Sequence, residues 1–191
     1  MKPTKPTKPK TDNAAFGDFS TPGEVRLVRL LPGPIERVWG FLTDPEKRAR
    51  WFCGGVLEQK AGGQVVFAMV HKNLAPNETP PAGYAKVQDP GVTFEGRVLR
   101  CERPRLLVYT FGSKKSEVTF ELTPQGRQVL LVLTHRTRGS ETKELGNYAS
   151  GWHTHLALLV AVAQGTRRPS FWSLFSRLEA HYEKIQAANQ A

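Results

Sequence analysis

The sequence predicts an α+β domain in which a strongly bent antiparallel sheet, of about six to seven strands, wraps around one long helix near the C-terminus. Residues 147–165 carry the most apolar helical pattern of the chain, and residues 56–136 form a run of short strand patterns separated by tight turns. Residues 171–185 add a second, amphipathic helical stripe. A helix that is apolar on several sides needs more than one neighbour to cover it, and a curved sheet provides that cover.

Length and composition indicate one soluble globular domain. The chain has 191 residues, of which 39% are hydrophobic and 23% are charged. No apolar run approaches the roughly 18 residues that a membrane-spanning helix needs. The Lys/Pro/Thr-rich start lacks the apolar segment of a signal peptide, so we expect a cytoplasmic protein in which Cys53 and Cys101 stay reduced.

The net charge of +10 raises the question of a nucleic-acid partner. Lys2, Lys5, Lys8 and Lys10 lie in the first ten residues, and the other basic residues are scattered over predicted strands and loops. No basic motif interleaved with aromatic residues occurs, so we expect a solvated basic surface and no specific nucleic-acid partner. The expected organisation is a disordered Lys/Pro-rich tail (1–21), one domain (22–166) and a C-terminal helical extension (167–191).

Local signals order the elements. A strand over 24–31 precedes a helix over 35–43 that Pro34 opens, and Asp44 with Pro45 begins a second short helix. The Pro-rich segment 73–83 is a predicted long loop. The main predicted strands cover residues 64–71, 94–101, 106–111, 117–123 and 129–136.

Two helices end the chain. Asn147 and Ser150 are candidate N-caps of the long helix, and Gly165 is its expected stop. Ser170 is the candidate N-cap of the last helix, whose apolar stripe we expect to pack back on the domain. The alternative for that stripe, over residues 171–185, is a protein partner or a dimer contact. Its members are Phe171, Leu174, Phe175, Leu178, Tyr182 and Ile185.

Several phrases, taken in order over residues 24–165, resemble one known family. Val38-Trp39 with Leu42-Thr43-Asp44-Pro45 and Trp51-Phe52 is similar to its helix–turn signature. The segments 94–98, 107–111, 116–122 and 133–135 are similar to its central strands, and Gly151-Trp152 with His155-Leu156 to its last helix. Together they resemble the SRPBCC (START-like, helix-grip) superfamily, in its branch named activator of Hsp90 ATPase homologue 1-like. Phe171-Trp172 and Tyr182-Glu183 are similar to the tail of many bacterial members.

The resemblance implies a helix-grip fold with an elongated apolar cavity between the sheet and the long helix, suited to a small hydrophobic ligand. Histidines could anchor polar groups of such a ligand or titrate near neutral pH. The candidate cavity residues are Phe67, Met69, His71, Phe94, Tyr109, Phe120, Leu133, His135, Trp152 and His155.

Plainer interpretations stand beside these. The aromatic candidates could be ordinary core, and a histidine on an apolar helix face could be an interior hydrogen-bonded residue. His153 and His155 diverge by about 200° on a helix and cannot chelate one metal together. We therefore expect no metal and no cofactor, and assign no catalytic residue; Cys53 is a lone thiol without an evident activator.

Three function classes remain. The favoured one is a ligand-binding module without chemistry of its own. A protein-interaction or chaperone-activating module is the second, although the chaperone-activating relatives are similar to this chain only in the shared domain. An enzyme of the cyclase, dehydratase or hydrolase kind, using cavity His and Tyr side chains, is the third. No buried carboxylate partner for such chemistry is evident in the predicted strands.

Overall fold

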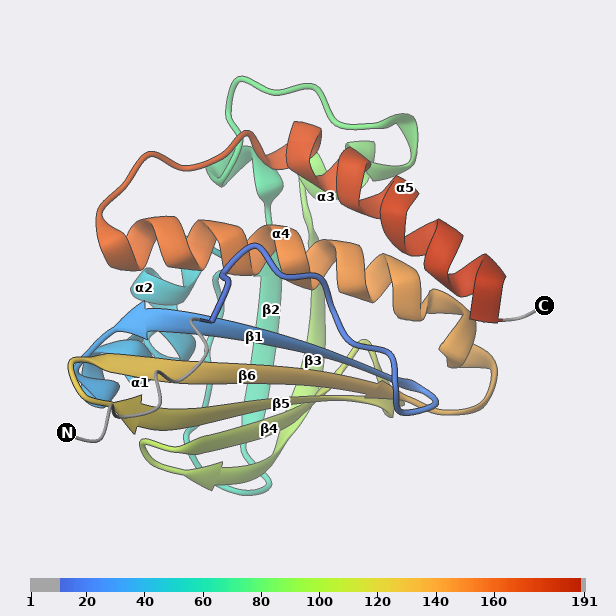
Figure 1. Cartoon of the computed structure of the whole chain (residues 1–191). Helices are drawn as coiled ribbons and strands as arrows, with labels where there is room; N and C mark the ends of the chain where they lie inside the picture. Colours follow the sequence, from blue (N-terminus) through green and yellow to red (C-terminus); the bar gives the residue numbers. More distant parts are fainter. Residues whose placement is uncertain (1–10, 190–191) are drawn as a thin grey trace, which may run out of the picture.

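The computed structural model describes residues 11–189, so the Lys-Pro repeat of the predicted tail, at 2–10, lies outside the described residues. Six antiparallel strands form one curled sheet in the order β1-β6-β5-β4-β3-β2. A long helix, α4, lies across the concave side of this sheet, and a second helix, α5, lies beside α4 (Figure 1). The predicted fold class is therefore confirmed.

The strands follow the predicted order with modest changes in their ends. Four of them, β3 to β6, form a continuous meander, and β1 closes it by pairing with β6 from Glu24–Arg136 to Pro32–Gln128. The strands are β1 (Glu24–Pro32), β2 (Gln64–Met69), β3 (Val92–Glu102), β4 (Leu106–Phe111), β5 (Ser113–Gln125) and β6 (Gln128–Thr137).

Helical segments connect the strands and cover the sheet. The long connection between β2 and β3 contains three short turns, where the sequence predicted a loop. The α-helices are α1 (Ile35–Thr43), α2 (Pro45–Ala49), α3 (Ala85–Gln88), α4 (Leu145–Gln164) and α5 (Phe171–Asn189), and the 3-10 helices are η1 (His71–Asn73), η2 (Ala82–Tyr84) and η3 (Gly139–Glu144).

The segment before β1 lies along the sheet. Asp18 and Arg26 exchange two backbone hydrogen bonds of 2.8 and 2.9 Å, and the side chain of Asn13 bonds both backbone groups of Leu30. The guanidinium of the fully buried Arg29 donates to the carbonyl oxygen of Ala15. The described part of the predicted tail, from residue 11 onward, is thus joined to the domain by hydrogen bonds.

One helix starts as predicted and another does not. α2 begins as expected, because the Asp44 carboxylate accepts from the backbone N–H groups of Glu46 and Lys47. α4 begins at Leu145, directly after η3, so the caps predicted at Asn147 and Ser150 are wrong. Ser150 instead lies inside the helix, where its hydroxyl donates to the carbonyl oxygen of Gly146 at 2.8 Å.

Gly165 ends α4, as predicted, with a left-handed φ of 68° that a residue without a side chain adopts most easily. α5 then turns back and packs along α4 (Figure 1). Of its stripe, Phe171, Phe175, Leu178 and Tyr182 are buried, Tyr182 fully so, and Leu174 is partly buried. Across residues 11–189, none of the helices combines the length and apolar character that crossing a membrane requires.

Candidate functional site

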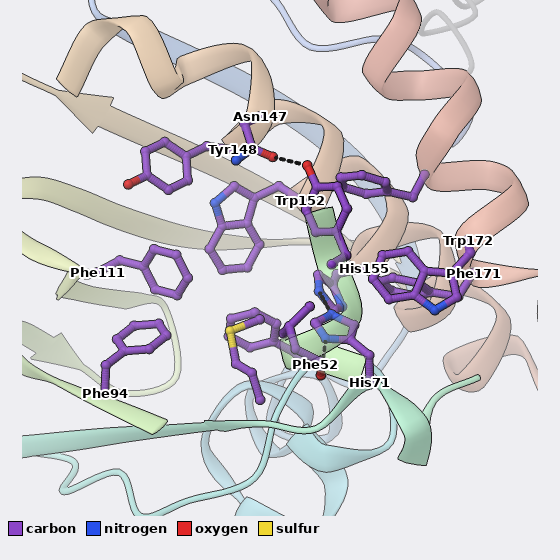
Figure 2. Close-up of a pocket in the computed structure, with 16 residues that line it drawn as sticks. Phe52, His71, Phe94, Phe111, Asn147, Tyr148, Trp152, His155, Phe171 and Trp172 are labelled. Carbon is purple, nitrogen blue, oxygen red and sulfur yellow. Dashed lines mark hydrogen bonds between the residues drawn. The ribbon is translucent and has the colours of Figure 1, made fainter. Parts of the chain in front are cut away.

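A cavity of about 350 Å³ lies where one end of the sheet, α4, α5 and the β2–β3 connection meet. Aromatic side chains dominate its lining (Figure 2). The sheet contributes Met69, Phe94 and Phe111, and α4 contributes Tyr148, Trp152 and His155. The remaining walls come from Phe52, from His71, Tyr84 and Val87 of the β2–β3 connection, and from Phe171, Trp172 and Phe175 of α5.

The pocket has a closed end and a more open end. Phe52, His155 and Phe171 are each no more than 3% exposed, so they form the closed end. Gly112 and Asn147, which also line the pocket, are exposed and lie at the open end. None of the described residues that line it is an Asp, Glu, Lys or Arg, so the interior offers no ionised side chain.

Half of the predicted site residues line this pocket: Met69, His71, Phe94, Trp152 and His155. Trp152 and His155 are three residues apart on α4, so their helical spacing places both on the pocket side. His71 follows the end of β2 and occupies the first residue of η1, not a strand position as the sequence predicted. This turn carries its ring toward α4.

The other five predicted residues, Phe67, Tyr109, Phe120, Leu133 and His135, lie outside the pocket lining and belong to the core beneath it. Phe67 stacks on Phe94 with ring centroids 4.9 Å apart, and Phe120 meets the edge of Trp152 at 5.8 Å. They form a second layer that supports the lining residues.

His71 and His155 meet at the closed end of the pocket (Figure 2). Their Nε2 atoms are 3.3 Å apart. The Nδ1 atom of His155 lies 2.9 Å from the carbonyl oxygen of Trp51, and the Nδ1 atom of His71 lies 3.4 Å from that of Val87. Both rings are thus held by backbone carbonyl groups on the side away from their shared contact.

Burial keeps these rings neutral. Desolvation lowers the pKa of His71 to about 4, opposed by its contact with the Val87 carbonyl. Desolvation together with the neighbouring His71 lowers the pKa of His155 to about 3. The pair therefore presents lone pairs and not positive charge at neutral pH. Among residues 11–189, no three His, Cys, Asp or Glu side chains gather closely enough to hold a metal ion.

The β2–β3 connection is fastened to α5 and α4 by polar contacts outside the apolar lining. The hydroxyl of Tyr84 donates to Glu179 at 2.5 Å and approaches Asn147 at 3.1 Å. The carboxylate of Glu78 accepts from Ser170 Oγ and from the backbone N–H groups of Phe171 and Trp172. The capping role that the sequence predicted for Ser170 is therefore performed by Glu78, a residue of the Pro-rich loop.

Sequence reasoning missed most of the pocket's aromatic wall, including Phe52, Phe111 and Phe171. Phe111 shares a strand face with Tyr109, so period-two alternation could have suggested it. The register with β5 is interrupted between Thr110 and Phe111, and of the Tyr109 and Phe111 rings only Phe111 lines the pocket. The α5 stripe was recognised as apolar, but a stripe alone does not reveal what it covers.

The family model of the activator of Hsp90 ATPase homolog 1-like protein (AHSA1) matches residues 32–164. The solution structure of the protein encoded by gene BPP1335 of Bordetella parapertussis is 41% identical, with a TM-score of 0.74, over 91% of this chain and 94% of that one. No curated protein matches the chain.

Two further structures share the fold at lower identity. CalU16 from Micromonospora echinospora is 22% identical with a TM-score of 0.61, covering 85% of this chain and 87% of that one. A conserved protein of unknown function from Enterococcus faecalis, EF2215, is 18% identical with a TM-score of 0.67, covering 86% and 85%. With its family match over most of its length and its curled sheet around α4, the chain belongs to the activator of Hsp90 ATPase homologue 1-like family of START-like proteins.

Proposed function

We propose that this protein binds a small, largely apolar molecule in the pocket between the sheet, α4 and α5. The observation that carries the proposal is the cavity of about 350 Å³ walled by aromatic side chains. Small-molecule sites in proteins have volumes of about 300 to 1,000 Å³ and combine apolar walls with a few polar groups. A pocket at the lower end of that range suits a flat molecule of two or three fused or linked rings.

The pocket walls also favour binding over catalysis. General acid–base chemistry needs a titratable group poised near the working pH, and the low pKa values of His71 and His155 remove both from that range. Tyr109, the tyrosine first considered for such a role, lies in the core with a pKa raised by burial. The α5 stripe considered for a protein partner packs against α4 and itself contributes Phe171 and Phe175 to the pocket wall.

Gly151 offers a direct test. It lies on α4 at the pocket, and a Cβ atom built on it meets no atom within 4 Å. Gly151→Leu should therefore fill the cavity without straining the helix, whereas Gly151→Ala fills little of it. Both substitutions replace a helical glycine, so each should preserve or raise the melting temperature.

The experiment is calorimetric titration with 2-naphthol as the probe, beside native mass spectrometry of protein purified from its own cells. We expect wild type and Gly151→Ala to bind the probe and Gly151→Leu to lose at least tenfold in affinity, a change of about 1.4 kcal/mol. A folded Gly151→Leu variant that binds as tightly as wild type would contradict the proposed site. Protein that carries no small molecule from its cells and binds no probe would contradict the function.

A further inference from the structure

The two imidazole nitrogens that face each other at the closed end of the pocket are both placed as hydrogen-bond acceptors. The Nδ1 atom of His155 faces the carbonyl oxygen of Trp51, and that of His71 faces the carbonyl oxygen of Val87. A carbonyl oxygen only accepts, so each Nδ1 that faces one carries the ring hydrogen. A neutral imidazole has one ring hydrogen, which leaves the Nε2 atom of each ring with its lone pair.

The pair therefore lacks one hydrogen. Its three contacts, two to carbonyl oxygens and one of 3.3 Å between the Nε2 atoms, need three N–H groups. Two neutral rings supply only two. A third proton on the rings would complete the set, but burial lowers the pKa of His71 to about 4 and that of His155 to about 3. With both ring hydrogens on the Nδ1 atoms, the missing hydrogen at neutral pH comes from another molecule.

Resting on the proposed function, we infer that the facing Nε2 atoms of His71 and His155 are the polar subsite of the pocket and select ligands that bring an O–H or N–H donor. A donor atom about 2.9 Å from each nitrogen would close a nearly equilateral triangle on their 3.3 Å separation. The ligand class is an aromatic alcohol, a phenol or an N–H heterocycle. An ether, ester or hydrocarbon of the same shape would leave both acceptors unpaired.

The surroundings make this selection strong. Phe171 lies against both rings, with centroids 4.7 Å from His71 and 5.1 Å from His155, and Phe52 meets His155 at 5.0 Å. These aromatic neighbours limit the access of water to the nitrogens. A buried acceptor that a ligand fails to pair discriminates far more strongly than a lost methylene group.

A matched pair of probes tests the inference: 2-naphthol, which has an O–H donor, and 2-methoxynaphthalene, which keeps the ring system without it. We expect wild-type protein to bind 2-naphthol at least about tenfold more tightly than 2-methoxynaphthalene. Gly151→Leu should weaken both probes, which ties them to the pocket. Equal affinity for the two would overturn the donor subsite and leave ligand binding standing, whereas failure of both to bind would overturn the two proposals together.

Imidazole ¹⁵N resonances give an independent readout that needs no substitution. The free protein should show His71 and His155 as Nδ1–H tautomers with unprotonated Nε2 atoms. 2-Naphthol should shift both Nε2 resonances, and 2-methoxynaphthalene should leave them nearly unchanged. An Nε2–H tautomer at either ring in the free protein would overturn the inference. Stoichiometric Zn²⁺, added alone, that shifts both resonances would assign the pair to a metal ion instead.

Discussion

The indole Nε1 of Trp152 donates a hydrogen bond to the Nδ1 atom of His135 at 2.7 Å. An indole N–H is a donor only, so Nδ1 accepts and the ring hydrogen of His135 resides on Nε2, 2.7 Å from the hydroxyl of Ser116. Desolvation lowers the pKa of His135 to about 3 and keeps this chain neutral. These hydrogen bonds join Trp152, in the pocket wall on α4, to His135 on β6 and Ser116 on β5.

A double-mutant cycle should reveal this coupling. Trp152→Phe and His135→Leu each leave a buried polar group unpaired, at a cost of about 1–3 kcal/mol beyond the change in packing. The double variant should be about 1–2 kcal/mol more stable than the sum of the single effects predicts. Urea unfolding measures it. Trp39→Phe is the control, because the indole of Trp39 bonds Gln59 and not His135, and its effect on stability should add to that of His135→Leu. Additive effects of Trp152→Phe and His135→Leu would disprove the coupling between Trp152 and His135.

Buried neutral histidines make the fold sensitive to acid. Burial lowers the pKa of His71 to about 4 and the pKa values of His135, His153 and His155 to about 3. The unfolded chain takes up these protons below about pH 6.5, whereas the folded protein does not, so stability is unaffected above that pH and falls below it. Below about pH 6.5, each of these histidines lowers the free energy of unfolding by about 1.4 kcal/mol per pH unit, until the pH reaches its pKa in the folded protein.

Circular dichroism should therefore show acid unfolding near pH 5, because the four losses together reach about 8 kcal/mol there, which is comparable with a typical folding stability of about 5–15 kcal/mol. The His153→Gln variant has one buried histidine fewer, so its free energy of unfolding should fall with pH less steeply, by about 1.4 kcal/mol per pH unit. A free energy of unfolding that stays constant from pH 7 to pH 5 would contradict the neutral state of these rings.

Arg48 should be irreplaceable even by lysine. Its side chain is 1% exposed and donates to the carbonyl oxygens of Cys53, Gly54, Gly55 and Val66. One ammonium group cannot reproduce the geometry of a guanidinium that bonds several oxygens. We expect Arg48→Lys to lower the free energy of unfolding by about 2–3 kcal/mol and Arg48→Met by more, measured in urea. Arg50→Lys, at an exposed position, should change it by less than about 0.5 kcal/mol; equal effects at the two sites would refute this role.

Glu78 should act on α5 from outside the helix. Burial alone would raise its pKa, but hydrogen bonds from Ser170 and from the backbone N–H groups of Phe171 and Trp172 outweigh it and lower the pKa. Glu78→Gln removes the negative charge from the helix N-terminus and should cost about 1 kcal/mol. Hydrogen exchange should then rise first in the opening turn of α5. Glu121→Gln, on an exposed strand position, is the matched control, and identical exchange in the two variants would rule the cap out.

Local sequence signals predicted the fold well because they report on nearest neighbours. Asp44 with Pro45 placed α2, and Gly165 placed the end of α4, since each acts within one turn of its own position. The cap of α5 could not be found in this way. Glu78 is separated from Ser170 by 92 residues, and only the folded chain brings them together.

The candidate site shows the same difference between local contacts, which the sequence predicted, and long-range contacts, which it did not. Trp152 and His155 were placed together by helical spacing, which is a local property. The meeting of His71 with His155 spans 84 residues and depends on β2 ending at Met69, so that His71 falls in a turn. The alternation of strand residues continues through His71 in the sequence, so it does not reveal that β2 ends at Met69. The same limit applies to Tyr109 and Phe111, because the register with β5 is interrupted between Thr110 and Phe111, which strand alternation does not foresee.

The family match ends at residue 164, whereas Phe171, Trp172 and Phe175 wall one side of the pocket from α5. The segment of α5 that closes the pocket thus lies outside the residues that the family model matches. Because the sheet is paired through its own strands, substitutions in α5 leave the strand register beneath it unchanged. If the proposed ligand binding holds, a chimaera that exchanges only the residues after 165 with those of a relative should change ligand preference while the sheet stays the same.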